Sequence, residues 1–168
     1  MAQVIIDQLE TALNETIYLL KGVDEKNINK IPFEGSWTAA QVGRHLYKSG
    51  VGSDALFAAA GEQAQRPADA GVAGLRNMFM NFEVKMKSPD FIIPEDKPFK
   101  KELLINSLAE VKDKMISAIK KADLNQVAQL PSGHPFYGST KLELVHFYTY
   151  HTLRHNHQLE KIKAIVIN

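Results

Sequence analysis

Two histidines near the C-terminal end of the chain have the spacing of metal ligands. His151 and His155 lie four residues apart in the run YTYHTLRHNHQLEKI. If that run is helical, both side chains lie on one face with Cβ atoms about 5–6 Å apart, so two imidazoles could bind one ion. A divalent cation would bind both rings as neutral ligands, whereas two protonated neighbours would repel. The residues also allow another interpretation, a hydrogen-bonded polar pair in the core.

A third histidine is a candidate to complete such a site from another segment. His45 lies beside the apolar residues Val42 and Leu46 in the run SWTAAQVGRHL. Its alternative role is that of an ordinary core or surface histidine. Three histidine ligands leave a coordination position for water, as in catalytic zinc sites. The candidate metal ligands are therefore His45, His151 and His155, and zinc, nickel, iron and manganese are the candidate metals.

An open site of three histidines supports more than one reaction. A bound divalent ion lowers the pKa of a coordinated water or thiol and polarises a substrate oxygen. No carboxylate lies clearly on the histidine face, while Tyr148 and Gln158 are candidates to hydrogen-bond a ligand or relay a proton. The pattern suits hydrolysis and thiol transfer on a small molecule equally, and it assigns no catalytic side chain.

The elements that would position these residues are four long helices. Apolar residues recur at helical spacing in four stretches, expected at about residues 4–22, 38–57, 103–121 and 140–164. Thr38 with Gln41, and Thr140 with Glu143, match capping boxes at the starts of the second and fourth helices. Because no strand signal competes with these helices, we predict an all-α four-helix bundle.

The fourth predicted helix turns the histidine pair toward the core. His151 and His155 share an apolar stripe with Leu144, Tyr148, Leu159 and Ile162. His146 and His157 fall on the other side of this helix and are expected to make surface contacts.

Two features outside this helix bear on the site. Residues 61–100 form a long, proline-containing connection between the second and third helices, and a connection of this length usually crosses the fold or covers a site. Gly43, Gly50 and Gly52 weaken the second helix, which indicates either a closely packed neighbour or room for a ligand. Trp37 is expected to anchor the loop before that helix.

Composition limits the class of protein. The chain of 168 residues is 45% hydrophobic and 23% charged, which is typical of one soluble globular domain spanning residues 1–168. Its net charge of +1 provides no field for binding nucleic acid or an anionic membrane. Cysteine is absent, so no thiolate can serve as a ligand or nucleophile. The N-terminal residues read as neither a signal peptide nor a membrane span, so we expect a cytoplasmic protein.

Three segments together resemble the DinB-like (DinB/YfiT) superfamily. They are SWTAAQVGRHL in the second predicted helix, HPFYGSTKLEL at the entry to the fourth, and YHTLRHNHQLEKI within it. The family pattern is one histidine on the second helix and an HxxxH on the last helix. Through the order of its helices, the resemblance extends over nearly the whole chain.

The resemblance implies a bundle with an unusual connection order, a divalent metal held by His45, His151 and His155, and a homodimer. It also implies the activities of characterised members, which include metal-dependent thiol transferases, using glutathione, mycothiol or bacillithiol, as well as hydrolases and isomerases. A small-molecule substrate is therefore expected. The alternative is a non-catalytic dimeric helical module whose histidines form a polar core or a relic metal site.

Overall fold

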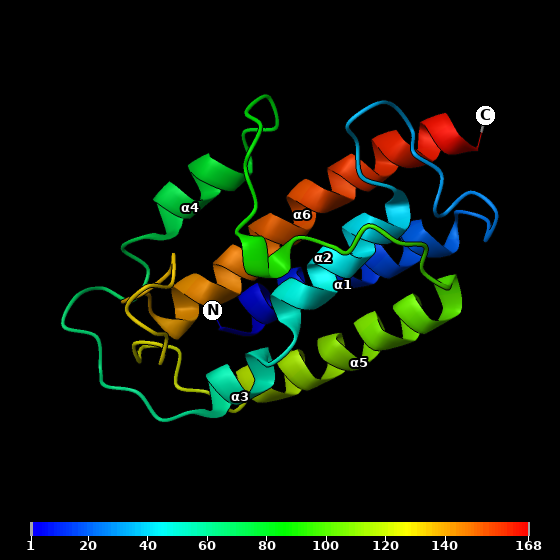
Figure 1. Cartoon of the computed structure of the whole chain (residues 1–168). Coiled ribbons are helices and arrows are strands. Elements are labelled where there is room, and N and C mark those ends of the chain that lie inside the picture. Colours follow the sequence, from blue (N-terminus) through cyan, green and yellow to red (C-terminus); the bar gives the residue numbers. More distant parts are fainter. Residues whose placement is uncertain (1, 168) are drawn as a thin grey trace.

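The computed structural model describes residues 2–167 and confirms the predicted all-α fold (Figure 1). Its elements are α1 (Ala2–Lys21), α2 (Ala39–Gly50), α3 (Ser53–Ala58), α4 (Val72–Phe79), the 3-10 helix η1 (Asp90–Ile92), α5 (Lys101–Ile119) and α6 (Lys141–Val166). Within the described residues, strand-like pairing is limited to two isolated bridges, Gln63 with Gln126 and Val127 with Thr140. No helix there is both long and apolar enough to cross a membrane.

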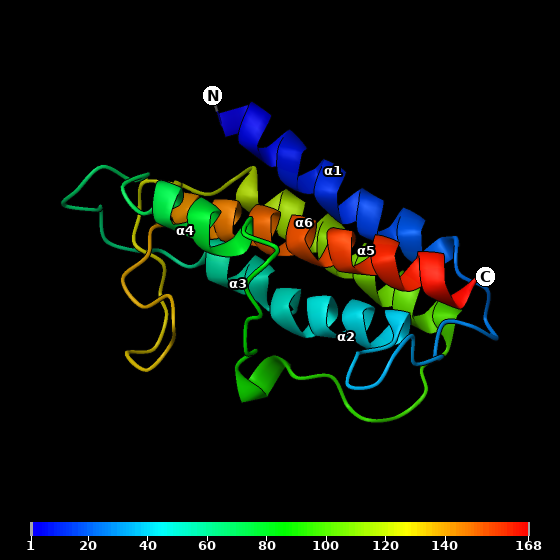
Figure 2. The same ribbon diagram turned by 90° about the horizontal axis from the view of Figure 1, so that it is seen from above.

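Four of these helices form the bundle. α1 packs against α5 and α6, and α2 also packs against α5 and α6, while α4 covers an outer side of α6 (Figure 2). This arrangement follows from the amphipathic pattern of the helices, because each must bury its apolar stripe against its neighbours.

The core consists of two hydrophobic clusters at opposite ends of the bundle. One contains Leu19 and Leu20 near the end of α1 together with Leu159 and Ile162 near the end of α6. The other joins the start of α1, α3, the end of α5 and the start of α6. Between them lies a buried polar layer made of Thr16, His45, His151, Thr152, His155 and Asn156. The polar layer occupies the middle of the bundle, where four helices surround it.

Hydrogen bonds tie α1 to α6 within this layer. Thr16 Oγ1 donates to Asn156 Oδ1 at 2.6 Å, and Asn156 Nδ2 donates to the Ala12 carbonyl at 2.9 Å. Buried polar groups are costly unless they are hydrogen-bonded, so these contacts permit a polar layer inside an otherwise apolar core.

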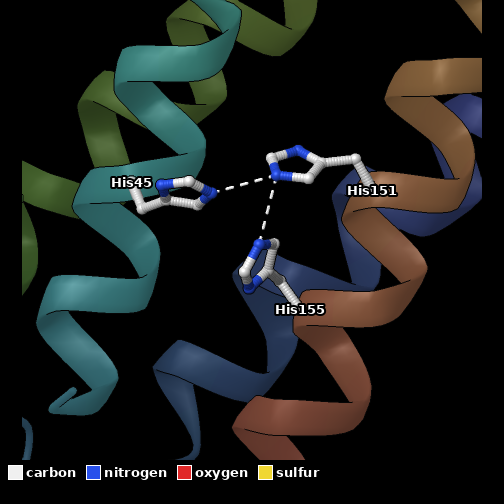
Figure 3. A group of neighbouring side chains, drawn as sticks. All are labelled: His45, His151 and His155. Carbon is white, nitrogen blue, oxygen red and sulfur yellow. Dashed lines mark hydrogen bonds between the residues drawn. The ribbon is translucent and has the colours of Figure 1, made fainter. Parts of the chain in front are cut away.

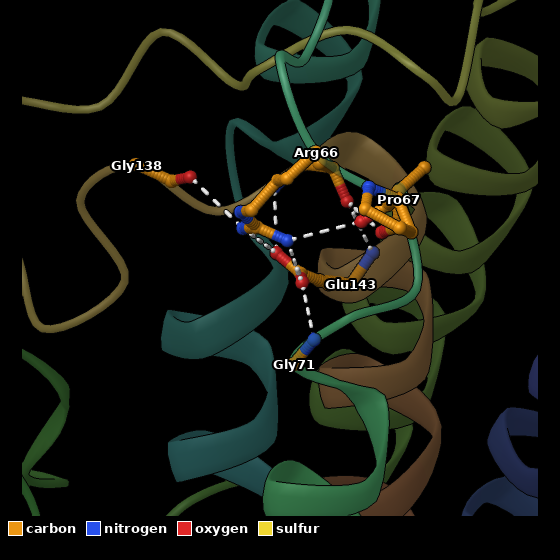
Figure 4. Close-up of polar contacts among 7 residues, drawn as sticks. Arg66, Pro67, Gly71, Gly138 and Glu143 are labelled. Carbon is orange, nitrogen blue, oxygen red and sulfur yellow. Dashed lines mark hydrogen bonds and ion pairs between the residues drawn. The ribbon is translucent and has the colours of Figure 1, made fainter.

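Both predicted capping boxes are confirmed. The Thr38 hydroxyl accepts from the Gln41 amide at 3.1 Å, and the Thr140 hydroxyl accepts from the Glu143 amide at 3.1 Å. Glu143 has a second role that the capping pattern does not predict. Its carboxylate, which is only 3% exposed, also accepts from the Arg66 guanidinium and from the Gly71 amide (Figure 4). The N-terminus of α6 is thereby joined to the 61–71 segment.

The second helix is shorter than predicted. We expected it to continue through Leu56 and Phe57, but α2 ends at Gly50 and α3 begins at Ser53. Gly52 lies between them with φ of 83°, a left-handed conformation that interrupts a right-handed helix. The short α3 that follows still buries Phe57 in the core.

The other two glycines of this region, Gly43 and Gly50, allow close packing of α2 against its neighbours. A Cβ atom on Gly43 would lie 3.0 Å from side-chain atoms of Leu104 and Leu20, and one on Gly50 would lie 2.9 Å from Val111. Because α2 approaches α1 and α5 at these positions, larger residues would push the helices apart.

Replacing Gly61 by alanine is expected to destabilise the protein. The new Cβ would overlap the carbonyl oxygen of Val127. This oxygen is a backbone atom, so no side-chain rotation can relieve the overlap. We expect a loss of about 2 kcal/mol in the free energy of unfolding, measured by urea denaturation. Gly74→Ala is the matched control, since nothing lies within 4 Å of a Cβ there and alanine favours the helix by about 0.5–1 kcal/mol. Equal stability of the two variants would contradict this prediction.

Candidate metal centre

The structure brings His45, His151 and His155 together in the polar layer (Figure 3). His45 comes from α2, and the other two come from adjacent turns of α6. Nε2 of His151 lies 2.9 Å from Nε2 of His45 and 3.1 Å from Nε2 of His155. The three side chains are buried, with exposed fractions of 1%, 5% and 9% in chain order. Three imidazole nitrogens thus converge on one enclosed point.

The outer nitrogens of two rings have hydrogen-bond partners that orient them. Nδ1 of His45 lies 2.9 Å from the Ile92 carbonyl oxygen, and Nδ1 of His155 lies 2.9 Å from Gln158 Oε1. Since a carbonyl oxygen can only accept, each Nδ1 carries the ring proton and each Nε2 presents a lone pair. Gln158 thus hydrogen-bonds one of the three histidines, a role the sequence allowed. The Ile92 carbonyl was not foreseen, because a backbone atom leaves no signal in the residue type.

Hydrogen bonds alone do not explain the close approach of the three Nε2 atoms, because the three rings carry too few protons there. His45 and His155 both contact Nε2 of His151 with lone pairs. A neutral His151 ring carries at most one proton at Nε2, and that proton can serve only one of the two contacts well. A cation at the common point would accept electron pairs from all three nitrogens, so the donor set fits a metal ion.

Burial prevents the rings from resolving the conflict by protonation. Burial lowers the pKa of His155 to about 3, and it also lowers the pKa of His45. The pKa of His151 lies well below its ordinary value because of burial and, next, the neighbouring His155 and His45. All three rings are therefore neutral near pH 7, which is the form that binds metals.

The two separations from Nε2 of His151 also fit a shared ion, and one ring nitrogen of each histidine lies within 4.8 Å of the others. Two nitrogens bound at about 2.0–2.1 Å to one ion lie about 2.9–3.4 Å apart for ligand angles between octahedral and tetrahedral values. The 2.9 Å and 3.1 Å separations lie in this range.

Aromatic rings surround the histidines. Trp37 lies 5.0 Å from the ring of His45 and 6.5 Å from that of His155, measured between centroids. Phe147 and Phe79 lie 5.2 and 5.8 Å from the ring of His151. Trp37 does pack against the core as expected for an anchor, but it also forms a wall of the histidine group. These apolar walls lower the local dielectric constant and so strengthen electrostatic interactions inside.

The long connection between the second and third predicted helices reaches the site from the α6 side. Arg154 lies between the two α6 histidines in sequence and donates to three backbone carbonyls of this connection. The acceptors are Phe79 at 3.2 Å, Asn81 at 2.8 Å and Val84. A single guanidinium therefore holds the end of α4 and the residues after it against α6.

The same connection is fastened to α2 on the other side of the histidines. Lys48 donates to the Ile93 carbonyl at 2.7 Å. Arg44 forms two hydrogen bonds with the Glu95 carboxylate, at 2.8 and 2.9 Å, which lower the pKa of Glu95 to about 2. These contacts flank the Ile92 carbonyl that orients His45. The connection thus contributes to the site.

The remaining histidines do not join the group. His134 lies in the loop before α6 and accepts a hydrogen bond from the Phe136 amide at 3.1 Å, so it shapes that loop. His146 stacks on Tyr150 and His157 stacks on Phe82, both away from the core as predicted. Within residues 2–167, the three core histidines are the one group that brings three metal-binding side chains together.

Comparison with known proteins places the chain in a family. The family profile described as the DinB superfamily matches residues 8–159. No curated protein and no solved structure matches the chain. The matched region includes all the bundle helices, at least in part, and contains His45, His151 and His155. The chain belongs to the DinB superfamily.

Proposed function

We propose that the protein is a divalent-metal-dependent enzyme that acts on a small molecule, with His45, His151 and His155 as metal ligands. The observation that carries this proposal is the convergence of their three Nε2 atoms, two of which present lone pairs to the third. Three ligands leave room on the ion for water or substrate, as in catalytic sites.

The reaction classes that suit this arrangement are hydrolysis and thiol transfer. A divalent ion would supply Lewis-acid chemistry, by lowering the pKa of a coordinated water or thiol. The protein supplies orientation, because Ile92 and Gln158 hold the rings of His45 and His155. Trp37, Phe79 and Phe147 supply an apolar surround that favours a substrate with an apolar portion.

One observation favours a second candidate function, a non-catalytic dimeric helical module. A hollow of about 860 Å³ lies beside α3 and α5 and touches none of the three histidines. A metal or polar core that only stabilises the bundle would need no substrate cavity. The two functions differ in turnover: the enzyme should process model esters or transfer a thiol such as glutathione only when metal is supplied.

Metal analysis of protein purified without a histidine tag tests the shared premise. We expect about one equivalent of a divalent metal per chain, either as isolated or after incubation with zinc, nickel or manganese followed by desalting. Thermal stability should rise with metal concentration, because an ion that binds only the folded state stabilises it. A stoichiometry that stays near zero after incubation would refute the site.

A further inference from the structure

A small cavity lies beside His151 in the centre of the bundle. Its volume is about 20 Å³, and its lining comes from α1, α2, α5 and α6. The hydroxyl-bearing residues in the lining are Thr16, Ser49, Tyr148 and Thr152, and Leu46, Leu108 and Met115 are among the apolar ones. A cavity of this volume accommodates one water molecule, provided that two to four polar groups hold it.

His151 differs from the other two histidines in the surroundings of its outer nitrogen. His45 and His155 use Nδ1 to hydrogen-bond Ile92 and Gln158. Both hydrogen bonds of His151 use Nε2, and its second ring nitrogen points away from His155 (Figure 3). Among the described residues, every fully enclosed side-chain nitrogen or oxygen has a partner. Nδ1 of His151 has no protein hydrogen-bond partner among these residues, so it is accessible to a water-sized probe, and His151 is one of the residues that line the cavity.

The polar lining offers both donors and acceptors. Thr16 already donates its hydroxyl proton to Asn156 Oδ1, so its remaining lone pair can only accept. Burial raises the pKa of Tyr148 to about 12, so its phenol keeps the proton and can donate. Thr152 lies one residue after His151 and is 2% exposed, so it faces the interior. One water could therefore accept from one group and donate to another without leaving the cavity.

We propose that this cavity binds one water molecule as the hydrogen-bond partner of His151 Nδ1, with Tyr148 and Thr152 as positioning residues. The water gives His151 the orienting contact that Ile92 and Gln158 give the other two rings. Its effect on metal affinity rests on the proposed function, whereas the presence of the water does not. Partners of metal-bound histidines typically contribute 10- to 100-fold in metal affinity.

The first test detects the water in the metal-free wild-type protein. Thr152, Leu108 and Val111 all carry methyl groups and are among the residues that line the cavity. Cross-relaxation between water and these methyls, measured by NMR in labelled protein, should show a long-lived internal water. Methyls of Val145, which is buried in the apolar core outside the cavity lining, provide the control. Absence of the signal at all three cavity residues would overturn the proposal, whether or not the protein binds metal.

The second test removes the two hydroxyls with little change in volume. The double variant Tyr148→Phe, Thr152→Val should lose the water signal and bind zinc about 10-fold more weakly in a titration. The matched control is Tyr150→Phe, Thr149→Val on the same helix, where Thr149 donates to the Val145 carbonyl and neither residue lines the cavity. The control should keep both the water signal and the zinc affinity.

These measurements separate the two proposals. If wild-type protein shows the water but binds no zinc, the metal proposal fails while the water site stands. If zinc binds and the double variant keeps wild-type affinity and its water signal, the assignment of Tyr148 and Thr152 is wrong. Thermal denaturation of both double variants without metal verifies that each remains folded.

Discussion

His151→Ala is expected to abolish metal binding. Nε2 of His151 is the nitrogen that both other histidines contact, at 2.9 and 3.1 Å, so its loss removes the centre of the group. The dissociation constant should rise by more than the roughly 100-fold that a partner of a metal-bound histidine contributes. At a metal concentration about 1,000 times the wild-type constant, wild type should gain about 4 kcal/mol of stability. The variant should gain less than about 1.5 kcal/mol, because its dissociation constant is more than 100-fold higher.

The matched control is His157→Ala. His157 lies on the same helix, but its ring stacks on Phe82 at 4.3 Å between centroids and faces away from the group. Its removal should leave metal stoichiometry and the metal-dependent shift in melting temperature unchanged. For the wild-type protein this shift should be about 8–16 °C, from about 2–4 °C per kcal/mol in a domain of this size. A His151→Ala protein that keeps a full equivalent of metal would contradict the assignment.

Glu143→Gln is expected to cause a large loss of stability. The buried carboxylate accepts from Arg66 at 2.5 and 2.7 Å, from Gly71 at 2.7 Å and from Thr140 at 2.9 Å. A glutamine would place an NH₂ group against some of these donors and leave them unsatisfied. Arg66 is 41% exposed, so solvent screens its contribution, and most of the cost arises at the two backbone amides. We expect a loss of about 2–3 kcal/mol in urea denaturation at pH 7.

The control for this variant is Glu110→Gln. Glu110 pairs with Lys114 on the surface of α5, and both side chains are more than half exposed. Such pairs contribute about 0.3–0.5 kcal/mol, so this variant should resemble wild type. Comparable losses in the free energy of unfolding of the two variants would show that the buried network at the start of α6 stabilises the protein no more than a surface ion pair does.

The effect of Glu143 should also depend on pH. Burial by itself raises the pKa of this carboxyl, but hydrogen bonds from Arg66, Thr140 and Gly71 outweigh burial and leave the pKa below its ordinary value. A group whose pKa is lowered by folding stabilises the folded state above its unfolded pKa, about 4.3 for glutamate. This stabilisation is lost as the pH falls through the folded pKa. The stability difference between wild type and Glu143→Gln should therefore be constant above about pH 5 and shrink in more acidic solution.

Much of the fold followed from local patterns. The apolar spacing predicted the four bundle helices, and the residue pairs Thr38 with Gln41 and Thr140 with Glu143 predicted two helix starts. These features depend on residues within a few positions of one another, so sequence reveals them directly. The sequence does not predict the break after Gly50, because closely spaced glycines such as Gly50 and Gly52 are compatible with either a packed helix or a left-handed turn.

For the site, residue types and spacing were enough to identify the candidate ligands and to place His151 and His155 on one face of α6. The packing of the helices decided that Nε2 of His45, 106 residues before His151, lies 2.9 Å from Nε2 of His151. It also decided that the Ile92 carbonyl orients His45, and that a cavity adjoins His151. Residue type and spacing encode contacts along one helix, whereas contacts between helices and with backbone atoms depend on how the whole chain packs.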